Sequence, residues 1–399
     1  MENPRQVIRS WNLQSNFQTG NVVKDNLVPP VYGRIRTPFI QTWREEALSQ
    51  SLDWGSKSFS VFLPESLRVV SAIYLKIVLP ANNAANYKAY PGLYAIDNIR
   101  IVSAGQEVYT VNYADFMTDY CQSLSNEELA HFREVYLGHT GGSVSGATRT
   151  ILLPIMLPNS AYLHRNGHDT RGHGVMPLFL GQNRCELQIT LNDATFTSTD
   201  TSNPTPTIAG ACALMYHEVQ MTDSKIQKYC DQRGKYSIIT RRFTEITNGW
   251  QHYSSANSIA SWSINQPQGV VTEVMFIAVA HASDDAQRSR REYILPTSLK
   301  VTADSIVQKN LDTPEKVKCD LWVNGFKPNT EFPGCGRLCF ANHCAEGSTH
   351  MYTGGYSMGL SSTITFEYSF GSACDVRIVA IQLQRVKINA LGVMRAYLE

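Results

Sequence analysis

One long apolar stretch occurs twice in this chain, and the segments that follow each copy limit the folds open to it. The first copy, VVSAIYLKIV, begins at Val69, and the second, VVTEVMFIAVA, begins at Val270. After each copy come polar residues and then two short β-branched segments around a small turn. Because the spacing from the stretch to these segments is nearly the same in both halves, the sequence predicts one structural unit used twice.

Short runs of β-branched and aromatic residues, broken by Gly, Pro, Asn and Asp, predict strands throughout both halves. In the first half they lie at 59–63, 69–78, 98–102, 107–111, 149–157, 185–191 and 211–219. In the second half they lie at 236–240, 270–280, 298–301, 305–307, 363–368 and 375–383. We match 236–240 to 59–63 as the opening strands. Two units of about eight strands, roughly 170 residues each, suit a pair of antiparallel sandwiches.

Two helices are expected between strands of the first unit. Residues 125–128 read Ser-Asn-Glu-Glu, which is a capping box, and Leu129 and Phe132 follow at helical spacing. A second helix is expected just upstream, at 113–120. We interpret both as short insertions in a β-framework.

The first 45 residues differ from the rest of the chain, because polar runs separate isolated aromatic residues such as Trp11 and Trp43. Such a segment cannot bury enough of itself to offset the entropy lost on ordering, so it predicts an extended arm lying on another surface. The expected organisation is an N-terminal arm at 1–45, a first unit at 46–222 and a second unit at 223–399.

The charge balance argues against a nucleic-acid-binding protein. Of the 399 residues 17% are charged, and the net charge is +1. This balance gives no strongly basic surface for a polyanion. Basic residues gather at Arg241 and Arg242, and again at Arg288, Arg290 and Arg291. We interpret both groups as solvated or inter-subunit charge faces and expect no specific nucleic-acid partner.

Nothing in the sequence resembles a secretory signal or a membrane span. Residues 1–5 lead into no apolar region, and no run approaches the ~18 apolar residues of a spanning helix. We therefore expect folding in the cytoplasm, with the nine cysteines as reduced thiols that are mostly small core residues.

Two clusters offer metal-ligand residue types. The first is Cys335, Cys339, His343 and Cys344; the second includes His164 and His168. The first lacks a paired Cys-x-x-Cys and looks like a strand whose cysteines fill core gaps, and the second lies in a loop rich in Gly and Arg. We expect no metal and keep zinc as the alternative.

No catalytic motif is recognisable. The chain has no His-x-His pair of the cupin type, no Gly-x-Ser-x-Gly elbow and no phosphate-binding loop. The sequence therefore predicts a protein that is not an enzyme and needs no cofactor.

Three regions resemble the double jelly-roll major capsid proteins. These proteins form a lineage shared by large eukaryotic DNA viruses, adenovirus hexons, virophages and tailless membrane-containing bacteriophages. The regions are 37–39 with 59–61 and 77–80, the hairpin from 97–101 to 106–109, and the closing segments 376–380 and 386–393. The resemblance covers nearly the whole chain as an arrangement of strands with few fixed letters.

The resemblance implies an all-β protein with two tandem eight-stranded antiparallel jelly rolls, short helical insertions and an extended N-terminal arm. It implies a major capsid protein of an icosahedral virion that forms homotrimeric, pseudo-hexagonal capsomers. Expected partners are the chain itself, neighbouring capsomers, minor capsid or penton proteins and an internal membrane surface. Synthesis and assembly would take place in the host-cell cytoplasm or a viral factory.

The arm is then expected to bind under or between capsomers, facing an acidic partner or a membrane. The residues assigned to this role are Arg5, Arg9, Trp11, Arg34, Arg36 and Trp43. Two alternatives remain open beside a metalloenzyme that would use the two clusters of metal-ligand residues. One is a β-sandwich receptor- or carbohydrate-binding viral protein with exposed aromatics such as Trp322, Tyr352 and Tyr356, and the other is a non-capsid scaffolding protein of the same fold.

Overall fold

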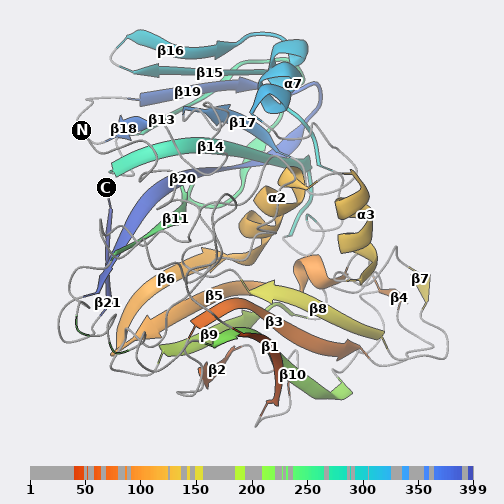
Figure 1. The fold of residues 1–399 in the computed structure, drawn as a ribbon. Coiled ribbons are helices and arrows are strands. Elements are labelled where there is room, and N and C mark those ends of the chain that lie inside the picture. The colour runs from red at the N-terminus through yellow and green to blue at the C-terminus, as the bar shows by residue number, and fades with distance from the viewer. Residues whose placement is uncertain are drawn as a thin grey trace.

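The computed structural model describes residues 40–48, 52, 58–63, 69–79, 86–87, 91–124, 126–135, 142–143, 149–155, 185–193, 209–220, 227, 231, 237–264, 269–284, 288, 293–303, 305–324, 335–340, 355–358, 364–388 and 394–398. The described chain folds into antiparallel sheets with a few helices (Figure 1). No helix in these ranges is long and apolar enough to cross a membrane.

The first half forms two four-stranded sheets. Sheet 1 has the order β1 (Ile40–Ala47), β10 (Ala209–Gln220), β3 (Val69–Leu79) and β8 (Arg149–Ile155). Sheet 2 has the order β2 (Ser58–Phe62), β9 (Cys185–Leu191), β5 (Ile96–Ser103) and β6 (Gln106–Asn112). A short pair, β4 (Asn86–Tyr87) with β7 (Gly142–Ser143), and a 3-10 turn at Pro91–Tyr94 lie beside them.

The second half repeats this topology. Sheet 3 has the order β11 (Ser237–Glu245), β20 (Cys374–Ile388), β14 (Gly269–Ala280) and β17 (Gly336–Cys339). Sheet 4 has the order β13 (Ala260–Ile264), β19 (Ile364–Ser369), β15 (Ser298–Ala303) and β16 (Ile306–Leu311). Sheet 3 is extended by β12 (Gln251–Tyr253) and β21 (Met394–Leu398) beside β20, and by β18 (Tyr356–Met358) beside β14.

The strand orders confirm the repeat predicted from the sequence. We count only the eight strands in the two sheet orders of each half. In both halves the first of these strands pairs with the last, the last with the third, and the second with the next to last. The two apolar stretches are the equivalent strands β3 and β14, each paired with the closing strand of its own half. Eight strands in two four-stranded sheets, connected in this order, make a jelly roll, so the chain contains two in tandem.

One match between strands of the two halves was wrong. We matched 236–240 to 59–63, but β11 is the equivalent of β1, since each pairs with the closing strand of its roll. The true opening strand, Ile40–Ala47, falls mostly within the segment expected to be the arm. It was missed because its side chains from Trp43 to Ala47 are exposed, so it lacks the apolar alternation of a half-buried strand.

Both expected helices are present, as α2 (Tyr113–Ser123) and α3 (Asn126–Val135). A further helix, α7 (Pro314–Val323), follows β16 just as α2 follows β6. Its start is marked in the sequence by Thr313, whose hydroxyl accepts a hydrogen bond from the Lys316 amide, and by Pro314 in the first turn. The two rolls therefore carry helices at the same place.

Sheet 3 is buried on both faces and joins the two rolls (Figure 1). On β14, Val274 and Phe276 point into the core of the second roll, whereas Met275 and Ile277 join the core that continues into the first roll. On the first-roll side, β6 lies next to β11 and β21. This double coverage explains why the second copy of the repeated stretch is nearly continuous in apolar residues.

Candidate functional site

Helix α2 connects the rolls because it has two distinct faces. The Asn112 side chain accepts hydrogen bonds from the amides of residues 114 and 115 and so fixes where the helix begins. Tyr113, Phe116 and Met117 pack into the first-roll core. Its polar residues at 115, 119 and 122 recur at helical spacing, which places them on one stripe.

This polar stripe meets sheet 3 in a buried charge cluster, called here the roll junction. It consists of Asp119 and Gln122 of α2, Arg241 of β11, Glu273 of β14 and Arg337 of β17. Every member has a relative exposure of 0% or 1%. Two guanidinium groups and two carboxylates from both rolls therefore share one enclosure.

Arg337 is the centre of the roll junction. Its Nη1 lies 2.7 Å from Asp119 Oδ1 and 2.7 Å from Glu273 Oε2. Its Nε donates to Gln122 Oε1 at 2.8 Å. Burial on its own lowers the pKa of Arg337, whereas the charges of Asp119 and Glu273 raise it, and the pKa lies above its usual value. The arginine is therefore charged at any pH at which the fold exists.

Arg241 completes the roll junction from the neighbouring strand. Its guanidinium hydrogen-bonds both Asp119 carboxylate oxygens and lies 3.6 Å from Glu273 Oε1. A buried ion pair is stable only when its geometry and hydrogen bonds offset the loss of hydration. Here the two positive and two negative charges balance, so the roll junction is neutral overall. Because Asp119 comes from the first roll and the other charged groups from the second, these contacts form only in one arrangement of the two rolls.

A second contact between the rolls lies one helical turn earlier. Asp115 of α2 is paired with Arg377 of β20, whose guanidinium lies over the Trp250 ring at 5.3 Å from its centroid. Burial raises the pKa of Asp115 to about 6, although Arg377 acts in the opposite direction. This pair extends the inter-roll contact along α2.

The interpretation of Arg241 as part of a solvated or inter-subunit face was wrong, because this side chain is fully buried in the roll junction. Sequence reasoning also missed Glu273 and Arg337. One signal existed: Glu273 stands where the first copy of the repeat has Ala72, which is a charge placed inside an otherwise apolar strand. A buried charge of this kind indicates a partner elsewhere in the fold.

Two cysteines of the first candidate metal cluster, Cys335 and Cys339, lie in the protein interior. Cys335 immediately precedes β17 and donates its thiol to Gln122 Oε1 at 3.1 Å, and Cys339 is buried at the end of the strand. Burial raises the pKa of Cys335 to about 12 and so favours the neutral thiol. Their partners His343 and Cys344, and the second cluster with His164 and His168, lie outside the described residues.

Of the residues assigned to the arm, only Trp43 is described; Arg5, Arg9, Trp11, Arg34 and Arg36 are not. Trp43 lies on β1, is 56% exposed, and packs against Tyr74 and His217 with ring centroids 5.8 and 4.7 Å away. It therefore marks the outer face of sheet 1 as a surface with an exposed aromatic group.

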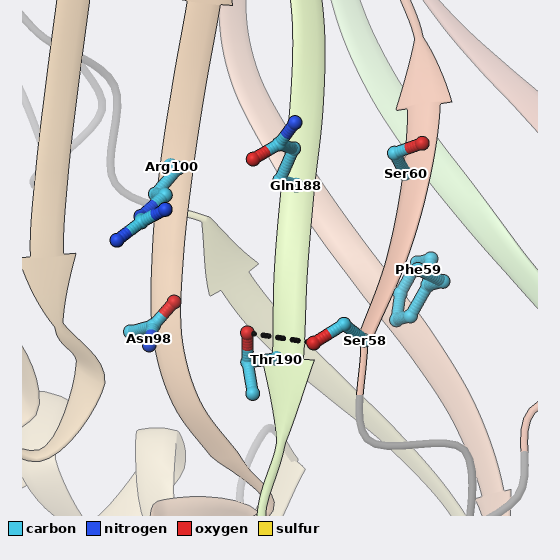
Figure 2. Close-up of a pocket in the computed structure, with 7 residues that line it drawn as sticks. All are labelled: Ser58, Phe59, Ser60, Asn98, Arg100, Gln188 and Thr190. Carbon is cyan, nitrogen blue, oxygen red and sulfur yellow. Dashed lines mark hydrogen bonds between the residues drawn. The ribbon is translucent and has the colours of Figure 1, made fainter. Parts of the chain in front are cut away.

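The outer face of sheet 2 forms a shallow depression with a volume of about 400 Å³ (Figure 2). Its lining side chains are mostly small or amide groups: Ser58, Phe59, Ser60, Asn98, Arg100, Gln188 and Thr190. Ser58 and Thr190 share a hydrogen bond of 3.2 Å across the strands. A surface of this kind suits hydrogen bonding to another macromolecule, and it presents no pair of titratable groups for catalysis.

Comparison with solved structures identifies the fold. No protein-family model matches the chain, and no curated protein matches it. A chain of the PBCV-1 virus capsid matches with a TM-score of 0.69 and 13% identity, over 94% of this chain and 100% of that one. The Faustovirus major capsid protein matches with a TM-score of 0.59 and 8% identity, over 90% and 92% of the two chains.

The mavirus major capsid protein also matches, with a TM-score of 0.56 and 10% identity over 92% of each chain. At these identities the likeness concerns the fold, and it extends through both rolls. The chain therefore has the double jelly-roll fold found in major capsid proteins of several viruses.

Proposed function

We propose that this chain is the major capsid protein of an icosahedral virus. The observation that carries the proposal is the likeness to viral capsid subunits along almost the whole chain, including the order of both rolls. The role is structural, and it needs rigidity and large contact surfaces rather than a reaction. The roll junction supports it, because it holds the two rolls as one unit.

We further propose that three copies form a ring of six rolls, which gives a homotrimeric, pseudo-hexagonal capsomer. Within one chain, α2 of the first roll contacts sheet 3 of the second roll. The equivalent head-to-tail contact between chains would bring α7 of the second roll against sheet 1 of the next chain. A head-to-tail contact that closes by rotation makes a ring.

The exposed side chains agree with such a contact. Trp322 and Val323 at the end of α7 have relative exposures of 74% and 66%. Counted from the N-cap residue of each helix, Val323 occupies the position that Gln122 has on α2. Trp43 is exposed on sheet 1, the sheet equivalent to sheet 3. Both predicted contact surfaces therefore offer apolar groups that a second copy would cover.

The remaining roles are assigned by position. Of the two helices between residues 113 and 136, α2 is enclosed within its own chain by sheet 3. Helix α3 and the loops 138–148, 164–174 and 195–207 would form outward or trimer contacts, and the arm would bind under or between capsomers. Neighbouring capsomers, minor capsid or penton proteins and an internal membrane surface are the proposed partners. The proposed location is the virion, with assembly in the host cytoplasm or a viral factory.

The test is the mass of the purified protein in solution by light scattering, with negative-stain images of the same sample. We expect about three times the chain mass of 44.6 kDa and a near-hexagonal outline. Trp322→Ser should shift the mass toward the monomer, because it removes an apolar group from the contact between chains.

Lys318→Ser, which changes an exposed polar residue of the same helix, is the matched control and should leave the trimer intact. A wild-type protein that is monomeric at assembly concentrations would contradict the capsomer. A stable trimer that never forms shells with its partner proteins would favour the scaffolding role instead.

A further inference from the structure

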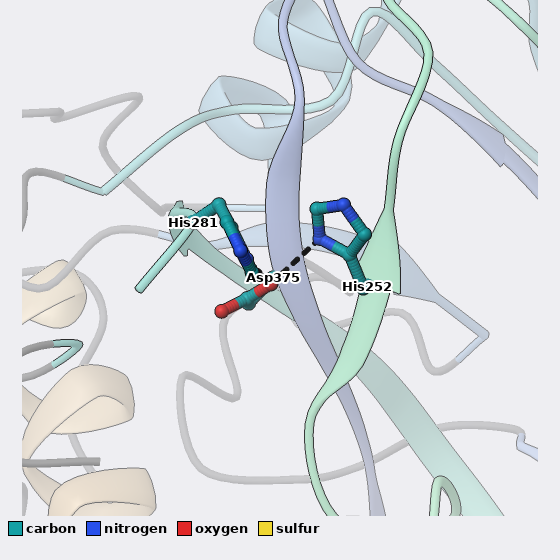
Figure 3. A group of neighbouring side chains, drawn as sticks. All are labelled: His252, His281 and Asp375. Carbon is teal, nitrogen blue, oxygen red and sulfur yellow. Dashed lines mark hydrogen bonds and ion pairs between the residues drawn. The ribbon is translucent and has the colours of Figure 1, made fainter. Parts of the chain in front are cut away.

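Two histidines and an aspartate from distant parts of the second roll meet at one end of sheet 3 (Figure 3). His252 lies on β12, His281 directly follows β14, and Asp375 lies near the start of β20. One ligand atom from each lies within 4.8 Å of the others. The chain separations of 123 and 94 residues explain why the sequence analysis did not identify the group.

The two carboxylate oxygens of Asp375 have different partners. Oδ1 faces both imidazoles, with His281 Nδ1 at 2.8 Å and His252 Nδ1 at 3.0 Å. Oδ2 accepts hydrogen bonds from Arg288 Nε at 2.7 Å and from the Ala282 amide at 3.2 Å. Burial raises the pKa of Asp375, but hydrogen bonds from His281, Arg288, Ala282 and His252 outweigh it and hold the pKa well below its usual range.

We propose that His252, His281 and Asp375 form a binding site for one divalent transition-metal ion, with zinc as the best match. A tetrahedral Zn²⁺ bonds imidazole nitrogen and carboxylate oxygen at about 2.0–2.2 Å, so its ligand atoms lie about 3.3 Å apart. The Nδ1–Oδ1 distances of 2.8 and 3.0 Å need only a few tenths of an ångström of expansion.

The surroundings fit a metal site in two further ways. The carboxylate oxygen that would not bind the ion is already held by Arg288 and Ala282, as ligating carboxylates commonly are. The Asp375 side chain is 1% exposed, whereas those of His252 and His281 are 46% and 53% exposed, so an ion can enter from solvent past the imidazoles. Water would supply the fourth ligand.

Zinc is favoured over calcium or magnesium by the ligand types. Two imidazoles and one carboxylate suit zinc and its transition-metal neighbours, whereas calcium and magnesium prefer sites built of oxygen atoms. The ion would tie together the ends of β12, β14 and β20. The site is therefore a cross-link within the second roll, and it does not depend on the capsid role.

The experiment compares zinc binding by the full chain and by the double variant His252→Asn with His281→Asn, after removal of metal with a chelator. Asparagine keeps a donor for the Asp375 carboxylate and removes the metal ligand. We expect the wild type to bind one more zinc ion per chain than the variant, by calorimetry and elemental analysis. Zinc should also raise the melting temperature of the wild type more than that of the variant.

His131→Asn, on an exposed position of α3, is the control and should bind as much zinc as the wild type. Cobalt(II) provides a test on the unmodified chain: we expect a four-coordinate ligand-field spectrum without a thiolate charge-transfer band. Equal zinc stoichiometry in the wild type and the double variant would overturn the proposal. A strong thiolate band as the only cobalt signal would do the same and would point to the cysteines instead.

Discussion

At the residue scale, the charged groups of the roll junction depend on one another, because removing any one of them leaves a buried charge uncompensated. Arg337 faces two carboxylates, and nothing else in the junction except Arg241 carries positive charge. Removing one member of a buried ion pair is costly, because it leaves a charge without hydration or a partner. The cluster is therefore sensitive to single substitutions even if its net contribution to stability is small.

Arg337→Met tests this sensitivity, because methionine fills a similar volume without the charge. We expect the free energy of unfolding to fall by about 3–5 kcal/mol. Arg100→Met is the matched control. Arg100 pairs with Glu107 at 3.5 Å with both side chains about half exposed, and its loss should cost no more than about 1 kcal/mol.

Urea denaturation followed by tryptophan fluorescence measures both effects. Equal denaturation midpoints for the two variants would contradict the central role given to Arg337.

The residues of the junction were only partly predictable. The polar stripe of α2 follows from its spacing once the helix is recognised, and Glu273 is conspicuous inside an apolar strand. Their pairing with Arg241 and Arg337 could not be predicted, because it depends on how one roll lies against the other. The histidine and aspartate group could not be predicted either, because its members are far apart in sequence and only the pairing of β12 and β14 with β20 brings them together.

At the element scale, the two copies of the repeated strand differ where their surroundings differ. Lys76 of β3 is partly exposed and pairs with Glu45 at 2.7 Å, whereas Ile277, at the equivalent place on β14, is buried. Ala72 is likewise replaced by Glu273. The residues facing each roll's own core stay apolar in both copies. The differences therefore mark the face of sheet 3 that the first roll covers.

Strand β17 contains a glycine that tight packing requires. A Cβ at Gly336 would lie 2.2 Å from Pro296 Cγ and 2.6 Å from Pro296 Cδ. A proline ring cannot rotate away, so Gly336→Ala forces the strand to move. We expect a loss of about 1–3 kcal/mol in the free energy of unfolding.

Gly371→Ala is the matched substitution, because its Cβ would meet only Thr297 Cγ2 at 3.8 Å. It should leave the stability within about 0.5 kcal/mol of the wild type. Thermal denaturation compares the two variants, and equal melting temperatures would show that the Pro296 contact is not restrictive.

Most strands of the two rolls and the helices α2 and α3 could be predicted from sequence, because local patterns specify them, whereas β1 and β13 were not predicted. Capping residues at 125–128 and alternation at 185–191 needed no tertiary information. The opening strand β1 was assigned to the arm because its exposed Arg44, Glu45 and Glu46 resemble a solvated segment. Only its pairing with β10 identifies it as part of the sheet.

At the scale of the whole molecule, the two rolls differ in what covers them. Sheet 3 is covered by the first roll, whereas its counterpart, sheet 1, exposes Trp43 within this chain. A ring of three chains would cover both equally. In such an assembly β1 would lie at the contact between chains, which is where the proposed connecting arm joins the described part of the chain.

Deleting residues 1–35 tests the arm while leaving β1 and both cores intact. We expect trimers of unchanged outline that no longer assemble into closed shells, because the segment proposed to connect capsomers is absent. Electron microscopy of assembly reactions checks the shells, and light scattering checks the trimers. Shells that form equally well without these residues would contradict the connecting role.

The roll junction has a consequence for how a particle built from this chain would come apart. Dissolved salt screens charges that face water over a distance of about 10 Å at 0.1 M, but it does not reach groups enclosed by protein. The guanidinium and carboxylate groups of the junction are fully enclosed. Raising the ionic strength would thus weaken ion pairs that face water and leave those of the junction unscreened, so the two rolls of each chain would stay joined under conditions that disrupt surface charge contacts.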